Sequence, residues 1–193
     1  MPRTRYRRRD VTFRARWLGS EEASQLLEFA LALPLLAVLV VGIFDFGGAF
    51  NLKRQLSNAA RDGARVGATL PMSDLTSPAI PFSVVTVFSA VDAYLLRSQI
   101  NDCGLGSATL VPAGGTYSWT ATASSGCPGA GLTLTIDRAY MFNPNGVDVI
   151  STHVSLSYPY QWRFNSVIQL LVPGAAYGGT IQVAGEAIMP NME

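Results

Sequence analysis

One long apolar run near the N-terminus limits what this chain can be. The sixteen residues from Phe29 to Phe44 carry no charge and no strongly hydrogen-bonding side chain; Asp45 interrupts the run, and Phe46–Phe50 continues it. A helix needs about 20 mostly apolar residues to cross the hydrocarbon core of a bilayer, and residues 29–50 provide 22. We therefore predict a single membrane-spanning helix rather than a buried core helix or the shorter apolar centre of a signal peptide.

Basic residues are concentrated before this helix. Seven of the 14 Lys and Arg residues lie within the first 16 positions, whereas the chain from Ser24 onward has seven basic and ten acidic residues, a net charge of −3. Positive charge beside a membrane helix marks the cytoplasmic side, which explains the basic segment without nucleic-acid binding. We expect a basic cytoplasmic leader over 1–23, a long helix over 24–70 with its membrane-spanning part at about 29–50, and an extracytoplasmic domain over 71–193.

The two cysteines, Cys103 and Cys127, belong to the extracytoplasmic part on this topology. In an oxidising compartment two such thiols pair, so we predict a Cys103–Cys127 disulfide. The chain has no C-x-x-C motif and no Cys/His cluster, and we therefore expect no metal ligands.

The remaining sequence predicts an α+β domain. Apolar residues at helical spacing from Val84 to Leu95 favour a helix capped by Ser83, with a strand as the alternative because of the valines. Short alternating runs follow, and Asn145-Gly146 is a hairpin turn signal. We predict a long N-terminal membrane-spanning helix, one further helix and an antiparallel sheet of about four strands, which include Thr116–Thr122, residues 132–137, residues 150–158 and Thr180–Ile188. Residues 164–172 are either a short helix or a segment that dips into lipid headgroups.

Small residues form two adjacent rows on the polar half of the long helix. Ala59, Gly63 and Gly67 are spaced four residues apart, and Ala60, Ala64 and Ala68 form the neighbouring row. Such a strip lets another backbone approach closely. Two glycines inside a helix cost roughly 1 kcal/mol each relative to alanine, which indicates a packing role. The partner is either the protein's own sheet, which we favour slightly, or a neighbouring subunit.

Four short motifs together resemble the TadE-like family of pilin-related proteins from Flp (tight adherence) pilus systems. They are Leu27–Leu31 (LEFAL), Leu33–Leu36 (LPLL), Gly42–Gly47 (GIFDFG) and Asn58–Arg65 (NAARDGAR). In the type IV pilin class, a prepilin peptidase cuts just before a segment that has Glu at its fifth position. Glu28 is the fifth residue of a chain that begins at Ser24. The position before the cut is usually Gly in this class, and Ala23 occupies it here.

The resemblance implies a function. It implies a non-enzymatic, pilin-like minor subunit of a Flp/Tad-type pilus or related secretion apparatus, held in the inner membrane until its apolar helix joins a filament. Glu28 then pairs with the free amine of a neighbouring chain, and Phe29 packs beside it. The implied partners are the prepilin peptidase, other pilin subunits, the assembly machinery and, before assembly, membrane lipid. The alternative is a membrane-tethered binding module that recognises a sugar or surface partner and never polymerises.

The sequence contains no convincing catalytic or cofactor site. His153, the only histidine, alternates with serines on the polar side of a predicted strand. Asp92, Asp102, Asp137 and Asp148 have no spacing that would bring two carboxylates together, so we expect them to be solvated or to cap turns. No phosphate loop or metal motif is present, and we expect neither catalytic residues nor a cofactor.

We predict that the mature protein begins at Ser24, because this start places Glu28 at the pilin-class position directly after the basic leader. N-terminal mass spectrometry on protein from cells tests the cut between Ala23 and Ser24. A chain that still begins at Met1 or Pro2 would contradict cleavage, and a start after Gly19 would contradict the register.

Overall fold

The computed structural model describes residues 21–76, 79–114, 117–164, 169, 174 and 179–192. Its helices and strands are α1 (Glu21–Ala68), α2 (Phe82–Arg97), β1 (Val111–Pro112), β2 (Ser118–Ala123), β3 (Leu132–Phe142), β4 (Val149–Gln161) and β5 (Thr180–Pro190). Short 3-10 turns lie at Ser73–Thr76, Leu105–Ser107 and Pro144–Gly146. A long apolar helix, one further helix and an antiparallel sheet confirm the predicted α+β fold class.

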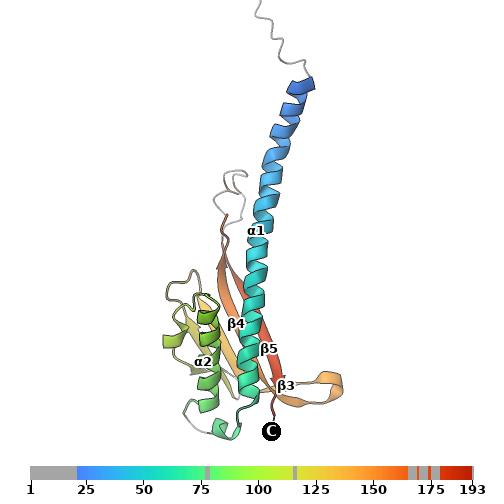
Figure 1. Ribbon diagram of the computed structural model, residues 1–193. Coiled ribbons are helices and arrows are strands. Elements are labelled where there is room, and N and C mark those ends of the chain that lie inside the picture. Colours follow the sequence, from blue (N-terminus) through green and yellow to red (C-terminus); the bar gives the residue numbers. More distant parts are fainter. Residues whose placement is uncertain are drawn as a thin grey trace, which may run out of the picture.

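The helix α1 is 48 residues long and continues through Pro34. It begins at Glu21, so residues 21–23, which we assigned to the leader, form its first turn. The N-terminal half of α1 projects beyond the rest of the molecule, whereas its C-terminal half lies against the sheet and beside α2 (Figure 1).

The five strands pair in chain order, β1-β2-β3-β4-β5, and every neighbouring pair is antiparallel. We predicted about four strands, and the additional one is β1. Its two residues pair with Thr120 and Trp119 of β2. β2 begins at Ser118 rather than at Thr116, and Thr116 lies outside the described residues. Most of the segment 164–172, whose conformation the sequence left open, also lies outside them.

The hairpin predicted at Asn145-Gly146 joins β3 to β4 through a 3-10 turn. Leu132, Leu134 and Ile136 are fully buried, as their alternation predicts. Ile150, predicted on the same apolar side of the sheet as Val154, is instead 48% exposed. The reason is that this end of the hairpin extends sideways beyond α1, so no helix covers it (Figure 1).

The helix α2 starts at Phe82, two residues before Val84, and its N-cap is Pro81 rather than Ser83. A carboxylate satisfies this helix end instead. Asp74 accepts hydrogen bonds from the Ser83 amide at 2.7 Å and from the Ser83 hydroxyl at 3.1 Å. The prediction that Ser83 caps the helix is therefore wrong, because Asp74 lies close enough to bind it. The buried face of α2 consists of Ser83, Val84, Val87, Phe88, Val91 and Leu95.

A fully buried arginine closes the C-terminal end of α1. Arg138 follows Leu132, Leu134 and Ile136 on the core side of β3, next to a register shift between Asp137 and Tyr140. Its guanidinium donates to the carbonyl oxygens of Gly67, Leu70 (2.9 Å) and Pro71 (3.4 Å) and to the Thr152 hydroxyl (2.8 Å). The last carbonyls of a helix lack intrahelical partners and carry partial negative charge, so a buried cation satisfies them.

We expect Arg138→Met, which keeps the chain length but removes every donor, to cost about 3 kcal/mol or more in the free energy of unfolding. The reason is that several buried carbonyls then lose charge-assisted hydrogen bonds. Urea unfolding of the full chain in lipid nanodiscs, followed by tryptophan fluorescence, measures the loss. Arg61→Met on the exposed face of α1 is the control and should change stability by less than about 0.5 kcal/mol. Equal stability of the two variants would contradict the capping role.

Candidate functional site

The candidate functional surface is the exposed apolar part of α1. Every residue from 24 to 44 is exposed or only partly buried, and Asp45 is the first fully buried residue. These 21 residues are about 31 Å long at 1.5 Å per residue, close to a hydrocarbon core of about 30 Å; the uncharged residues 29–44 among them, which belong to the predicted membrane-spanning part at about 29–50, account for about 24 Å. α1 is the helix of the described chain that is long and apolar enough to span a membrane.

The sequence-predicted processing and assembly residues all lie on this projecting part. The peptide bond between Ala23 and Ser24 lies in the first turn of α1, where few intrahelical hydrogen bonds hold the backbone. Glu28 is exposed, and Phe29 is 62% exposed. No described residue of the domain packs over this turn, so both side chains are accessible to another molecule.

The small-residue strip of α1 lies against the protein's own α2 and sheet. Ala59, Ala60 and Ala64 are fully buried. A Cβ atom added at Gly63 would lie 2.6 Å from Val91 of α2, and one added at Gly67 would lie 2.7 Å from Thr152 of β4. The strip is therefore occupied within the subunit at these positions.

Asp45 joins the long helix to the end of β4. Its carboxylate accepts hydrogen bonds from the backbone amides of Arg163 (3.1 Å) and Phe164 (3.3 Å). Its backbone carbonyl accepts the Tyr160 hydroxyl at 3.1 Å. The sequence showed Asp45 only as an interruption of the apolar run, and this contact is one that it did not reveal. Asp45 thus marks the point at which α1 leaves the domain.

Aromatic rings surround the same junction. Trp162 makes edge-on contacts with Phe46, at 5.3 Å between ring centroids, and with Tyr160, at 5.4 Å. Burial raises the pKa of the Tyr160 hydroxyl, and the nearby Asp45 carboxylate raises it further, against a smaller opposite effect of Arg163. Tyr160 is therefore a neutral hydrogen-bond donor at physiological pH.

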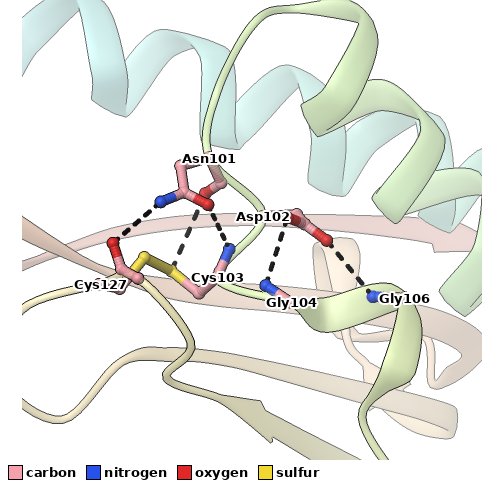
Figure 2. The surroundings of a disulfide bond; sticks show 7 residues. Asn101, Asp102, Cys103, Gly104, Gly106 and Cys127 are labelled. Atoms are coloured by element: carbon pink, nitrogen blue, oxygen red, sulfur yellow. Dashed lines mark hydrogen bonds between the residues drawn. A yellow bond between two sulfur atoms is a disulfide. The ribbon is translucent and has the colours of Figure 1, made fainter.

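The structure joins Cys103 to Cys127 in a disulfide (Figure 2). Neighbouring hydrogen bonds hold the same two loops. The Asn101 side chain donates to the Gly126 carbonyl at 3.0 Å and accepts from the Cys103 amide at 3.0 Å, and the Asp102 carboxylate accepts from the amides of Gly104 and Gly106. A closed loop of this size contributes roughly 3–4 kcal/mol in the loop-entropy model.

Asp92 and Asp102 lie close together, contrary to our expectation for the aspartates. Burial raises the pKa of Asp92, and the Asp102 carboxylate raises it further by charge repulsion and hydrogen bonding. The pair comes from α2 and the loop after it, so the tertiary turn, rather than sequence spacing, brings the two groups together.

The described residues show neither a metal cluster nor a catalytic arrangement around His153, whose contacts lie on the sheet surface. Within the described ranges, no group of three or more His, Cys, Asp or Glu residues is arranged to hold a metal. His153 lies 3.3 Å from the exposed Glu186 carboxylate and stacks on Tyr140 at 4.7 Å. These contacts connect neighbouring strands and place no nucleophile beside the imidazole.

The comparisons with known proteins concern α1. Residues 23–65 match the family model described as TadE-like protein. These 43 of the 193 residues lie entirely within α1 and contain all four motifs on which the resemblance rested. Searches of curated proteins and of solved structures found no match. The TadE-like family is a structural, pilus-associated family, and the match confirms the predicted similarity of residues 23–65 to it.

We expect Asp45→Asn to loosen the junction locally, because asparagine offers one acceptor oxygen to two backbone amides and turns an NH₂ group toward one of them. The opening free energy at the Arg163 and Phe164 amides should fall by about 1–2 kcal/mol, measured by hydrogen exchange. Asp62→Asn is the control, since the only described ion pair of Asp62 is a 4.0 Å contact with Arg65. Unchanged protection at both amides would contradict the anchoring role of Asp45.

Proposed function

We propose that this protein is a non-enzymatic, pilin-like structural subunit of a Flp/Tad-type pilus or a related secretion apparatus. The observation that carries the proposal is the match of the TadE-like family to a helix whose residues 24–44 project from a folded domain, with the uncharged apolar residues 29–44 exposed or only partly buried. Such a surface is stable in water only if lipid or other subunits cover it. A pilus-associated protein has both environments, lipid before assembly and other subunits afterwards.

Before assembly, the inner membrane surrounds the projecting apolar part of α1. In this proposal residues 1–23 are a cytoplasmic leader, α1 crosses the bilayer up to about Asp45, and the domain is extracytoplasmic. The basic N-terminal segment supports this orientation. The Cys103–Cys127 disulfide supports it independently, because disulfides persist in oxidising compartments.

After assembly, other subunits of a filament surround the same part of α1. After a prepilin peptidase removes the leader, the apolar part of α1 leaves the bilayer and packs among equivalent helices of other pilin-like subunits, in the role of a minor pilin. The new amine of Ser24 is the cation that Glu28 of a neighbouring chain pairs with. Because the small-residue strip of α1 is occupied by the subunit's own α2 and sheet, assembly uses the projecting half of the helix.

We expect Glu28→Gln to leave membrane levels normal and to reduce recovery in sheared filament fractions sharply. Loss of a partner for a buried amine costs roughly 3–5 kcal/mol, whereas a cap or dipole effect at the helix start costs at most about 1 kcal/mol. Quantitative immunoblots of membrane and filament fractions measure both.

Phe29→Ala is the matched control, because it removes packing at the neighbouring position without changing charge. Its incorporation should fall independently of pH, whereas the Glu28 effect depends on the carboxylate. Equal recovery of wild type and Glu28→Gln in filaments would reject the pairing mechanism. If neither is found there, the chain is a membrane-tethered module that does not polymerise.

A further inference from the structure

We propose that a groove between α1, β4 and the disulfide-linked loops binds a carbohydrate. This amide groove has a volume of about 340 Å³, within the range of small-molecule sites. Four residues with amide side chains, Asn51, Gln55, Gln99 and Gln161, line it. The inference does not rest on the proposed pilus function, since it concerns the domain rather than the projecting helix.

These four amide side chains are available for a ligand. Within the described part of the chain, none of them makes a hydrogen bond. Each amide offers an acceptor oxygen and two donor hydrogens, which suits the adjacent hydroxyl groups of a sugar, because every hydroxyl also both donates and accepts. By contrast, the side chain of Asn101, which also lines the groove, is already hydrogen-bonded to the Gly126 carbonyl and the Cys103 amide. It therefore stabilises the wall of the groove.

Gln99 occupies a strained backbone position that a glycine would fill more easily. It follows α2 with φ at 57°, and the bonds from the Gln99 amide to Leu96 and from the Ile100 amide to Leu95 form a helix-ending motif in which glycine is usual. The chain therefore has a long amide side chain at a backbone conformation that favours glycine. Strain of this kind is concentrated at functional sites, and here the strained residue lines the groove.

The remaining walls fit a sugar better than a peptide. The half-buried Tyr158 lines the groove and provides aromatic surface for the apolar face of a sugar ring, whereas Tyr160 beside it is only 8% exposed and is held by its hydrogen bond to Asp45. β4 extends beyond β3 here, since β3 begins at Leu132 and its first pair with β4 is Thr133 with Ser157. Among the described residues no strand pairs with this side of β4 beyond Ser157, and a peptide strand added there would meet Pro159, which has no backbone donor. Arg163 at the same groove allows an acidic sugar as well as a neutral one.

The groove is held in shape before any ligand arrives. One wall is the loop at Gln99–Asn101, which the Cys103–Cys127 disulfide and the Asn101–Gly126 hydrogen bond tie to the loop containing Pro128 (Figure 2). The opposite wall is α1 itself. A site that needs little ordering on binding loses less affinity to conformational entropy.

The test uses the full chain in lipid nanodiscs, because the sugar headgroups of glycoside detergents would compete for the groove. A glycan array of neutral and uronic-acid oligosaccharides identifies the best ligand, and titration calorimetry gives its Kd. Gln99→Gly should weaken binding about fivefold, the loss of one neutral hydrogen bond, while the protein unfolds at an unchanged or higher urea concentration. Asn51→Ala with Gln161→Ala should weaken binding about 25-fold.

Asn58→Ala is the control, an exposed amide of α1 outside the groove, and it should bind as wild type does. Binding of no oligosaccharide on the array, or equal affinity of wild type and both groove variants, would overturn the proposal. The same variants should enter filament fractions normally, so failure of the carbohydrate site is distinguishable from failure of the pilus function.

Discussion

The close approach of the second half of α1 to the sheet is the contact on which the rest of the structure depends. It occurs where glycines leave out side chains: a Cβ atom added at Gly185 of β5 would lie 2.6 Å from the backbone of Leu56, and one added at Gly67 of α1 would lie 2.7 Å from Thr152 of β4. The packing of α1 on the sheet buries Leu56, Val154 and Leu156 completely. It also fixes where the helix ends relative to the strands, and the other functional features are arranged around that position.

Two buried charges define the two ends of this packed region. Arg138 lies at the C-terminal end and donates to the carbonyl of Gly67 in the last turn of α1 and to those of Leu70 and Pro71 just after it. Asp45 lies at the other end and accepts from the backbone after β4. Each charge is matched to backbone groups that have no partner in a regular helix or strand, which compensates for its burial. Between them α1 belongs to the domain, and before Asp45 it is free for lipid or other subunits.

This division lets one helix serve two purposes. The small-residue face binds the subunit's own sheet, so the domain has a fixed position relative to the projecting apolar part. The amide groove lies beside the same junction, between α1 and loops held by the disulfide. In the functions proposed above, the projecting part of α1 anchors and assembles the protein and the groove binds a ligand, so the two surfaces can be altered independently.

The sequence by itself determined the long helix, the TadE-like resemblance, the second helix, the hairpin and the α+β class, because these depend on local periodicity and on residues close together in the chain. Its alternation even placed Arg138 on the same side of β3 as Leu132 and Ile136, a signal that sequence reasoning left unused. Only the tertiary structure decided what Arg138 and Asp45 bind, why Asp74 rather than Ser83 closes the start of α2, and that Asp92 lies beside Asp102. Those partners are separated along the chain and often include backbone groups, which have no signature in the sequence. The amide groove depends on the tertiary structure for the same reason, since its walls come from α1, β4 and two loops that meet only when the sheet packs on the helix.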